Sequence, residues 1–195
     1  MGPDSSGALS PAQVFNGVVM YHIVLVEPVI PQNTGSIARL CACTGASLHL
    51  IHPLGFQVDE ASVRRAGLDY WPHVNVKNHE SWEAFLENEK PERLFFFSKW
   101  GNRSFWRETF AKKPAYFVFG SETKGLPESL WKKYPDRFLK VPMRTDIVRS
   151  LNLAQCASVV LYEALRQDGF SAGTAASEEG TSSGSGGSDS GTSGT

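Results

Sequence analysis

Short β-branched and aromatic runs alternate with helix-like patterns along this chain, and that alternation restricts the fold more than any other feature. The runs occupy residues 23–26, 48–51, 74–76, 94–98, 116–119 and 138–141. The last three are almost continuously apolar, which is typical of strands covered on both faces of a sheet. Strands separated by helices form mostly parallel sheets. The sequence therefore predicts an α/β fold in which a mostly parallel sheet carries helices on both faces.

Helices are expected between these runs, and several of their ends carry capping residues. With their caps, the expected helices span residues 36–44, 59–66, 81–89 and 152–167. Gly45 is a good C-terminal cap for the first, and the Ser81 and Asn152 side chains can cap N-termini. A short helix is expected to start at Pro127, where a missing N–H costs nothing. The last helix has an apolar stripe that needs a partner, either the sheet or a second subunit.

The chain has enough apolar sequence for one domain, flanked by two segments of different composition. Its 195 residues are 41% hydrophobic, which suffices for one good core. Residues 1–19 show no periodicity and are expected to form a loose N-terminal extension. Residues 171–195 are almost wholly Gly, Ser, Thr and Ala, a composition that predicts a disordered tail. The folded domain is therefore expected at residues 20–170.

Charge is unevenly distributed between these regions. The net charge of the whole chain is -1, but the 19 Lys and Arg residues all lie between residues 20 and 170. Four of the 20 acidic residues lie outside this region, which leaves 16 within it and a local charge of about +3. A polyanionic substrate is compatible with this distribution.

Cysteine and histidine spacing indicates neither a disulfide framework nor a metal site. Cys41, Cys43 and Cys156 contain no Cys-x-x-Cys pair. His49 and His52 could in principle chelate a metal, but we interpret them as surface polar groups, and no metal is expected. No apolar run is long enough to cross a membrane, and residues 1–19 lack the features of a signal or transit peptide. We expect a cytoplasmic protein, or a plastid or mitochondrial one in a eukaryotic host.

Three polar segments, at residues 31–39, 120–127 and 149–153, each follow a strand-like run. Because the carboxyl ends of parallel strands meet at one edge of a sheet, these segments are expected to form one ligand pocket. The second segment is not a P-loop, because Lys124 precedes the second glycine instead of following it. A hairpin-like turn would explain its glycines but gives no reason for Glu122.

Each polar side chain in the other two segments has two interpretations. Asn33 or Thr34 could simply cap the following helix, and Arg39 could be a solvated residue on its surface. Arg39 also has a fork of donors suited to phosphate oxygens. Ser150 and Asn152 stand two positions apart in an extended segment, so both would point to one side, although either could be a helix cap.

A fourth segment combines cations with aromatic residues. Arg64 and Arg65 lie just before Asp69, Tyr70 and Trp71. This mixture suits contacts to backbone phosphates and a stacked base, although an amphipathic helix face explains it about as well.

Together these segments carry a resemblance to a known family. Residues 20 to about 170 resemble the SPOUT superfamily of RNA methyltransferases, and within it the small tRNA (cytidine/uridine-34) 2′-O-methyltransferases. The similar segments are Glu27-Pro28 with 31–39, 64–70, 119–127, 141–143 with 149–153, and 162–164. The resemblance implies a C-terminal trefoil knot, an obligate homodimer, S-adenosylmethionine as methyl donor, and the tRNA anticodon loop as partner.

The resemblance also implies roles for particular residues. The positions where the family holds the cofactor are Phe97, Gly120, Val141 and Ser150. The functional polar positions are Asn33, Arg39, Glu122, Ser150 and Asn152, with Tyr162 implicated in the branch that acts on tRNA. The pair Arg64 and Arg65 would face tRNA. One departure is Ala154-Gln155, where related enzymes commonly have Ser-Asn. We expect this change to act on the helix cap or the dimer contact, and on fine substrate choice more than on methyl transfer.

The implied mechanism is attack of the wobble ribose 2′-OH on the cofactor's methyl group, with Arg39 orienting the ribose through a neighbouring phosphate. One alternative is a 2′-O-methyltransferase for ribosomal RNA or another tRNA position, but such relatives usually carry an N-terminal RNA-binding domain that residues 1–19 cannot form. Another is a non-catalytic RNA-binding dimer, which would have no need of the polar residues above.

Overall fold

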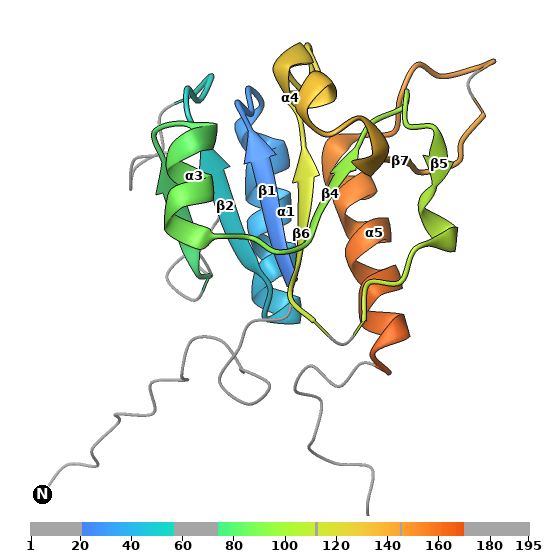
Figure 1. Cartoon of the computed structure of the whole chain (residues 1–195), viewed down its shortest axis with the longest axis horizontal. Helices are drawn as coiled ribbons and strands as arrows, with labels where there is room; N and C mark the ends of the chain where they lie inside the picture. The colour runs from blue at the N-terminus through green and yellow to red at the C-terminus, as the bar shows by residue number, and fades with distance from the viewer. Residues whose placement is uncertain (1–20, 57–73, 112, 145, 170–195) are drawn as a thin grey trace, which may run out of the picture.

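Seven parallel strands form the sheet in the computed structural model, which describes residues 21–56, 74–111, 113–144 and 146–169. Their order is β3-β2-β1-β6-β4-β7-β5, and each pair of neighbours runs parallel (Figure 1). The strands are β1 (Tyr21–Val26), β2 (Ser47–Ile51), β3 (Val76–His79), β4 (Leu94–Phe97), β5 (Arg103–Ser104), β6 (Ala115–Phe119) and β7 (Phe138–Lys140). The predicted parallel sheet is confirmed.

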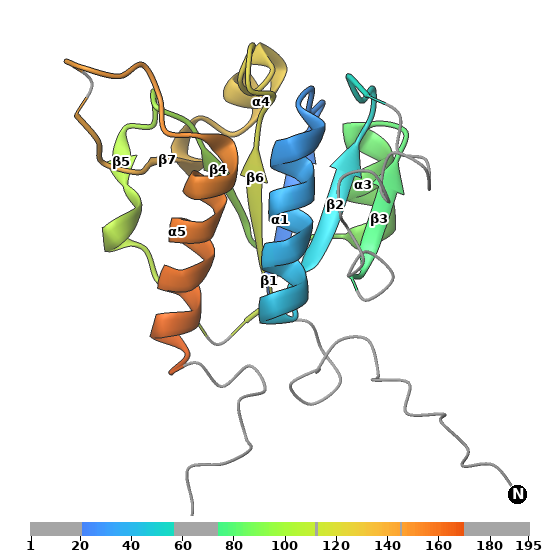
Figure 2. The same ribbon diagram turned by 180° about the vertical axis from the view of Figure 1, so that it is seen from behind.

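Helices cover both faces of this sheet, as the sequence predicts. They are α1 (Pro31–Thr44), α3 (Trp82–Glu89), α4 (Glu128–Lys133) and α5 (Leu153–Gln167), with 3-10 turns η2 (Phe105–Arg107) and η3 (Pro135–Arg137). Helices α1 and α5 lie side by side on one face (Figure 2). Helices α3 and α4 lie on the other.

The central strand β1 shows why the apolar runs are continuous. Ile23 and Leu25 belong to the core on the side of α1 and α5, whereas Val24 and Val26 belong to the core on the side of α3 and α4. All four are at most 3% exposed. Successive strand residues point to opposite faces, so a strand covered twice needs an apolar residue at each position.

The predicted caps of three helices are confirmed. Gly45 ends α1 with a φ of 72°, and its N–H donates to the Cys41 carbonyl oxygen at 2.9 Å. Ser81 Oγ accepts the Ala84 N–H at 3.1 Å at the start of α3. Asn152 caps α5 in the same way. These residues cap as expected because the required groups are local in sequence.

Some element boundaries were predicted wrongly. Helix α1 begins at Pro31 instead of residue 36, with Ile30 before it and no side-chain cap, so the interpretation of Asn33 or Thr34 as caps is wrong. Proline suits this first position because its φ is already helical. Strand β3 begins and ends later than predicted, and the two-residue strand β5 has no recognisable pattern. The predicted helix at 59–66 and both terminal segments lie outside the described residues.

Strand β7 lies between β4 and β5, which are joined by a short loop at 98–102. That loop passes close to β7: the Ser98 N–H donates to the Leu139 carbonyl oxygen at 3.0 Å. A Cβ added to Gly101 would be 2.4 Å from the Leu139 carbonyl carbon. A later strand thus lies beside a loop that connects two earlier ones, an arrangement that a trefoil knot requires. The knot itself stays a prediction.

The interpretation of His49 as a surface group is wrong. Its side chain is fully buried in β2, where it contacts His22 on β1 and His79 on β3. His52 does lie nearer the surface, with Nε2 3.4 Å from Asn78 Oδ1. Among the described residues, no helix combines the length and apolar character that crossing a membrane requires.

Candidate active site

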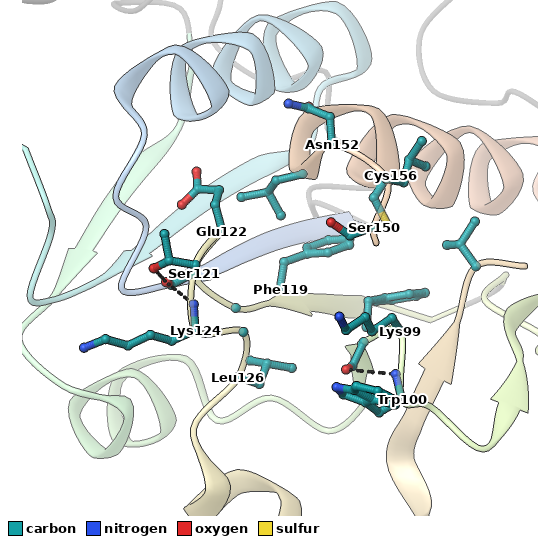
Figure 3. Close-up of a pocket in the computed structure, with 18 of the residues that line it drawn as sticks. Lys99, Trp100, Phe119, Ser121, Glu122, Lys124, Leu126, Ser150, Asn152 and Cys156 are labelled. Atoms are coloured by element: carbon teal, nitrogen blue, oxygen red, sulfur yellow. Dashed lines mark hydrogen bonds between the residues drawn. The ribbon is translucent and has the colours of Figure 1, made fainter. Parts of the chain in front are cut away.

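A cavity of about 490 Å³ opens where β4, β6 and β7 end (Figure 3). Its walls come from residues 97–100, 119–126, 141, 143 and 150–153, with Ile30 and Asn33 contributed by the segment around the start of α1. Small-molecule sites typically have volumes of roughly 300–1,000 Å³. Several residues of the polar segments 120–127 and 149–153 thus line the cavity, and the segment 31–39 contributes Asn33. The predicted pocket is therefore present.

Glu122 is held by two donors from the segment around the start of α1. The Val29 backbone N–H donates to Oε2 at 2.9 Å, and Asn33 Nδ2 donates to Oε1 at 2.9 Å. Asn33 is only 7% exposed, so this contact is largely shielded from water. The carboxylate therefore presents a fixed negative charge to the cavity, which favours a cationic group in a ligand.

Asn152 joins this arrangement from the start of α5. Its Nδ2 donates to Asn33 Oδ1 at 3.0 Å, while its own Oδ1 accepts the Ala154 N–H at 2.9 Å and the Gln155 N–H at 3.3 Å. One side chain therefore caps a helix, as one interpretation predicts, and also lines the cavity, while its functional role stays a prediction. The relay from Asn152 through Asn33 to Glu122 connects the three polar segments.

The segment after β6 is a tight turn with an open backbone. The Gly125 N–H donates to the Ser121 carbonyl oxygen at 2.8 Å, and Ser121 Oγ lies 3.2 Å from Thr123 Oγ1. Gly125 has a φ of 72° and lines the cavity, and a Cβ at this position would meet no atom within 4 Å. A ligand can therefore approach the backbone closely here.

The inner wall of the cavity is apolar. The Phe97 and Phe119 rings stack with centroids 5.0 Å apart, and Val141 is also buried. Burial raises the pKa of the Cys156 thiol, which lines the same wall, to about 12. This thiol therefore stays protonated near neutral pH and contributes packing, not nucleophilic chemistry.

Two residues on the outer edge of the cavity were missed by the sequence interpretation. Trp100 is 73% exposed, and Lys99 Nζ lies 4.9 Å from the centre of its ring. Both line the cavity, as does the exposed Lys124. The available signal was an aromatic residue beside a lysine directly after a buried strand, a combination that suits a nucleic-acid ligand.

Most of the predicted site residues meet at this cavity. Those that line it are Asn33, Phe97, Gly120, Glu122, Val141, Ser150 and Asn152. Arg39 and Tyr162 do not line it; both are exposed, on α1 and α5. Six helical residues beyond Asn33 place Arg39 about 9 Å further along α1. Arg64 and Arg65 lie outside the described residues.

The cavity fits the S-adenosylmethionine that the resemblance implies. Stacked Phe97 and Phe119 provide an apolar wall for a flat ring, and the open backbone at Gly125 allows close contact. Glu122 supplies a negative charge for a sulfonium or ammonium group. The donor set therefore matches a molecule with a flat apolar end and a cationic end.

Comparison with known proteins gives a consistent result. Residues 20–162 match the SpoU rRNA Methylase family. The chain is 48% identical over 157 residues to a tRNA (cytidine(34)-2′-O)-methyltransferase of Burkholderia cenocepacia (strain HI2424), an alignment covering 79% of this chain and 99% of that protein.

Solved structures are similar as well. One, from work on the 2-OH methylation of C/U34 on tRNA, is 47% identical with a TM-score of 0.70 and covers 76% of this chain and 96% of its own. Another is the SpoU methyltransferase AviRb from Streptomyces viridochromogenes in complex with the cofactor AdoMet. It is 25% identical, with a TM-score of 0.63, and covers 75% of this chain and 57% of its own.

Proposed function

We propose, from the premise that this chain belongs to the SpoU rRNA Methylase family, that it methylates the ribose 2′-OH of the wobble nucleotide of tRNA, cytidine or uridine 34. It is an S-adenosylmethionine-dependent enzyme. The observation that carries the proposal is the relay of Asn152, Asn33 and Glu122, which joins three distant segments at one cavity. The chain that contains this relay matches such an enzyme over 99% of that enzyme's length.

Within the cavity, bound S-adenosylmethionine supplies an electrophilic methyl group. Phe97, Val141 and the turn at 120–125 would hold the adenosine part, and Ser150, which also lines the cavity, would donate to it. Glu122 is fixed by Val29 and Asn33 and would pair with the cationic part. Since no reorganisation is needed when charge changes in the transition state, this fixed geometry lowers the barrier.

The chain must also position the ribose and help its hydroxyl lose a proton. Arg39 orients the ribose through the neighbouring phosphate and stabilises the developing alkoxide. A guanidinium stays protonated in proteins, so the proton leaves through the phosphate and not through Arg39. Arg64 and Arg65 contact the tRNA backbone around the anticodon loop, and Trp100 stacks on an unpaired base.

The proposal includes a homodimer, because Arg39 and Tyr162 do not line the cavity of their own chain. Helix α5 exposes Val159 and Tyr162, which are 37% and 45% exposed, and it packs beside α1, which carries the exposed Arg39. A second copy packed on this surface would bring both residues to the site. Sedimentation should give a mass near twice 21.4 kDa; a monomer mass in an active preparation would contradict the dimer. The proposed compartment is the cytoplasm, where tRNA is abundant.

The reaction itself is tested by incubating the protein with methyl-labelled S-adenosylmethionine and total tRNA, followed by nucleoside mapping. The expected product is a 2′-O-methylated cytidine or uridine at position 34. Label in ribosomal RNA, or at another tRNA position, would contradict the proposed substrate. Label in neither RNA, with cofactor binding intact, would contradict the enzymatic role.

Replacing Arg39 by Ala tests its role. Turnover should fall by about 1,000-fold or more because a charged donor to the transition state is lost. Cofactor affinity, measured by calorimetry, should stay nearly unchanged, since the proposed partner of Arg39 is an RNA phosphate and not the cofactor. Arg137→Ala, on the exposed turn η3, is the matched control and should retain full activity. Equal losses of turnover and cofactor affinity in Arg39→Ala would contradict the assignment.

A further inference from the structure

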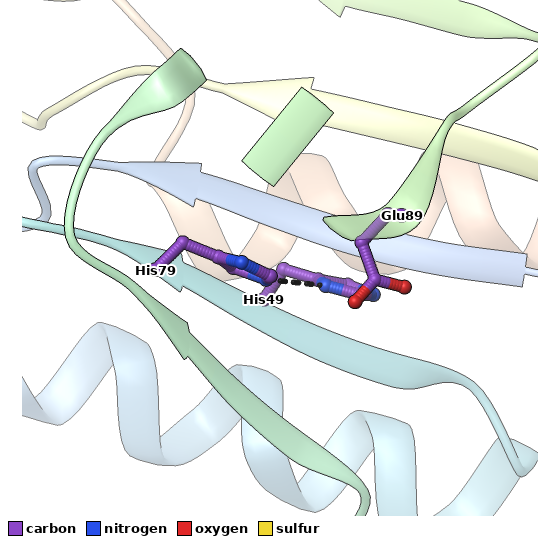
Figure 4. Close-up of side chains that lie close together, drawn as sticks. All are labelled: His49, His79 and Glu89. Atoms are coloured by element: carbon purple, nitrogen blue, oxygen red, sulfur yellow. Dashed lines mark hydrogen bonds between the residues drawn. The ribbon is translucent and has the colours of Figure 1, made fainter. Parts of the chain in front are cut away.

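Three ligand-type side chains meet in the interior, away from the cavity. One metal-ligating atom from each of His49, His79 and Glu89 lies within 4.8 Å of the others (Figure 4). His49 belongs to β2, while His79 and Glu89 end β3 and α3. None of the three lines the cavity described above. We propose that they form a Zn²⁺ site, independent of methyl transfer.

The distances suit a tetrahedral ion. His49 Nδ1 and His79 Nε2 are 3.0 Å apart. Zinc bonds of about 2.0–2.2 Å in a tetrahedral site separate neighbouring donor atoms by roughly 3.3 Å. The two imidazoles therefore need to separate by only a few tenths of an ångström, and the flexible Glu89 side chain closes the remaining gap. Two histidines and one carboxylate are a common donor set for zinc.

A neighbouring histidine holds the His49 ring in place. His22 Nδ1 lies 3.0 Å from His49 Nε2, on the far edge of that ring, and holds it in orientation as outer partners of metal ligands do.

One ring nitrogen of the cluster has no hydrogen bond to the described residues. His79 Nδ1 is buried, and no residue of the described part of the chain is hydrogen-bonded to it. The Phe85 ring packs edge-on against both His49 and His79, so water is largely kept out. Zinc on His49 Nδ1 and His79 Nε2 would replace the hydrogen bond between these two atoms and leave His79 Nδ1 as it is.

In the structure, the ammonium group of Lys77 pairs with Glu89, the carboxylate that the proposed zinc ion would bind. Its Nζ donates to both oxygens of Glu89 at 3.0 and 2.9 Å, and its side chain is 42% exposed. Lys77 and His79 stand two positions apart in β3 and so point to the same face of the sheet. Zinc would displace the ammonium into solvent, so Lys77 competes with the metal.

Because of this competition, the test predicts one variant with higher zinc affinity as well as variants with lower zinc affinity. Zn²⁺ is titrated into the chelator-treated full chain by calorimetry, and Co²⁺ is used to record the visible bands of a tetrahedral site. One Zn²⁺ should bind per chain. Glu89→Gln and His79→Gln should weaken binding about 100-fold, and Lys77→Met should strengthen it about tenfold because a like charge is removed. The control His52→Gln, a histidine outside the cluster, should leave affinity unchanged.

Binding that is absent, or equally strong in Glu89→Gln and the unaltered chain, would overturn the site. Weaker binding in Lys77→Met would do the same. Circular dichroism checks the fold of each variant, and if the two ligand variants are unfolded, the Lys77→Met comparison alone decides. Because the readout is zinc affinity, it is independent of whether the chain methylates tRNA.

Discussion

At the scale of single residues, the site depends on a few side chains that each serve two purposes. Asn33 accepts from Asn152 and donates to Glu122 while remaining almost fully buried. An amide suits this position because it has both a donor and an acceptor end. Glu122, by contrast, accepts one donor on each of its two oxygens, whereas an amide has a single oxygen and carries an NH₂ group in place of the second.

Glu122→Gln tests that difference. The new amide group would face either the Val29 N–H or Asn33 Nδ2, leaving one donor unpaired at a cost of about 1–3 kcal/mol. Loss of the negative charge should also lower methyl transfer by about 100-fold and weaken cofactor binding. Single-turnover rates and calorimetry measure both effects. Glu128→Gln removes an equally charged side chain that is 80% exposed, and its rate should not change.

At the scale of elements, helix starts and strand ends place the site. Helix α5 begins at its capping residue Asn152, so the same contact that starts the helix also aims an amide at Asn33. Helix α3 starts with the equivalent cap Ser81, which has no part in the cavity. Comparing the two helices therefore distinguishes the contribution of a cap to stability from its contribution to the site.

Asn152→Ala and Ser81→Ala form a matched pair. Each should lose about 1 kcal/mol of unfolding free energy through loss of the cap. Asn152→Ala should lose about 1–2 kcal/mol more, because the buried Asn33 oxygen loses its donor. Only Asn152→Ala should lower methyl transfer. Urea unfolding and initial rates check this, and equal rate losses in both variants would contradict a specific role for Asn152.

At the scale of the whole molecule, the close approach of the 98–102 loop to β7 holds the cavity together. The loop provides Lys99 and Trp100, and β7 leads into the segment that provides Val141 and Ser150. Gly101 lies where the two meet, and a Cβ there would be 2.5 Å from the Leu139 carbonyl oxygen. Because its neighbours are backbone atoms, they cannot move aside separately.

Gly101→Ala should therefore destabilise the protein by about 1–3 kcal/mol or more, as overpacking does. Gly125→Ala is the comparison, because its Cβ would meet no atom within 4 Å and only the positive φ adds a cost of about 1–2 kcal/mol. Urea unfolding followed by circular dichroism measures both. A smaller loss in Gly101→Ala than in Gly125→Ala would show that the loop and strand are not tightly packed.

Much of the site was predictable because its residues lie at the ends of strands with clear patterns. Asn33, Glu122 and Asn152 each follow such a run, and parallel strands end at one edge. Trp100 was missed because its loop has no pattern of its own. His49 was misplaced because a strand pattern does not say which polar side chains find partners inside.

The alternation of strand-like and helix-like runs by itself determined the α/β class and the parallel sheet, and the residue types at helix ends determined the three caps. Both signals are local, since periodicity and capping act over a few residues. Only the tertiary structure decided that β7 lies between β4 and β5 and that Asn33, Glu122 and Asn152 form one relay. It also decided that His49 meets His79 and Glu89. Such contacts join residues far apart in the chain, and their geometry depends on how all the elements pack at once.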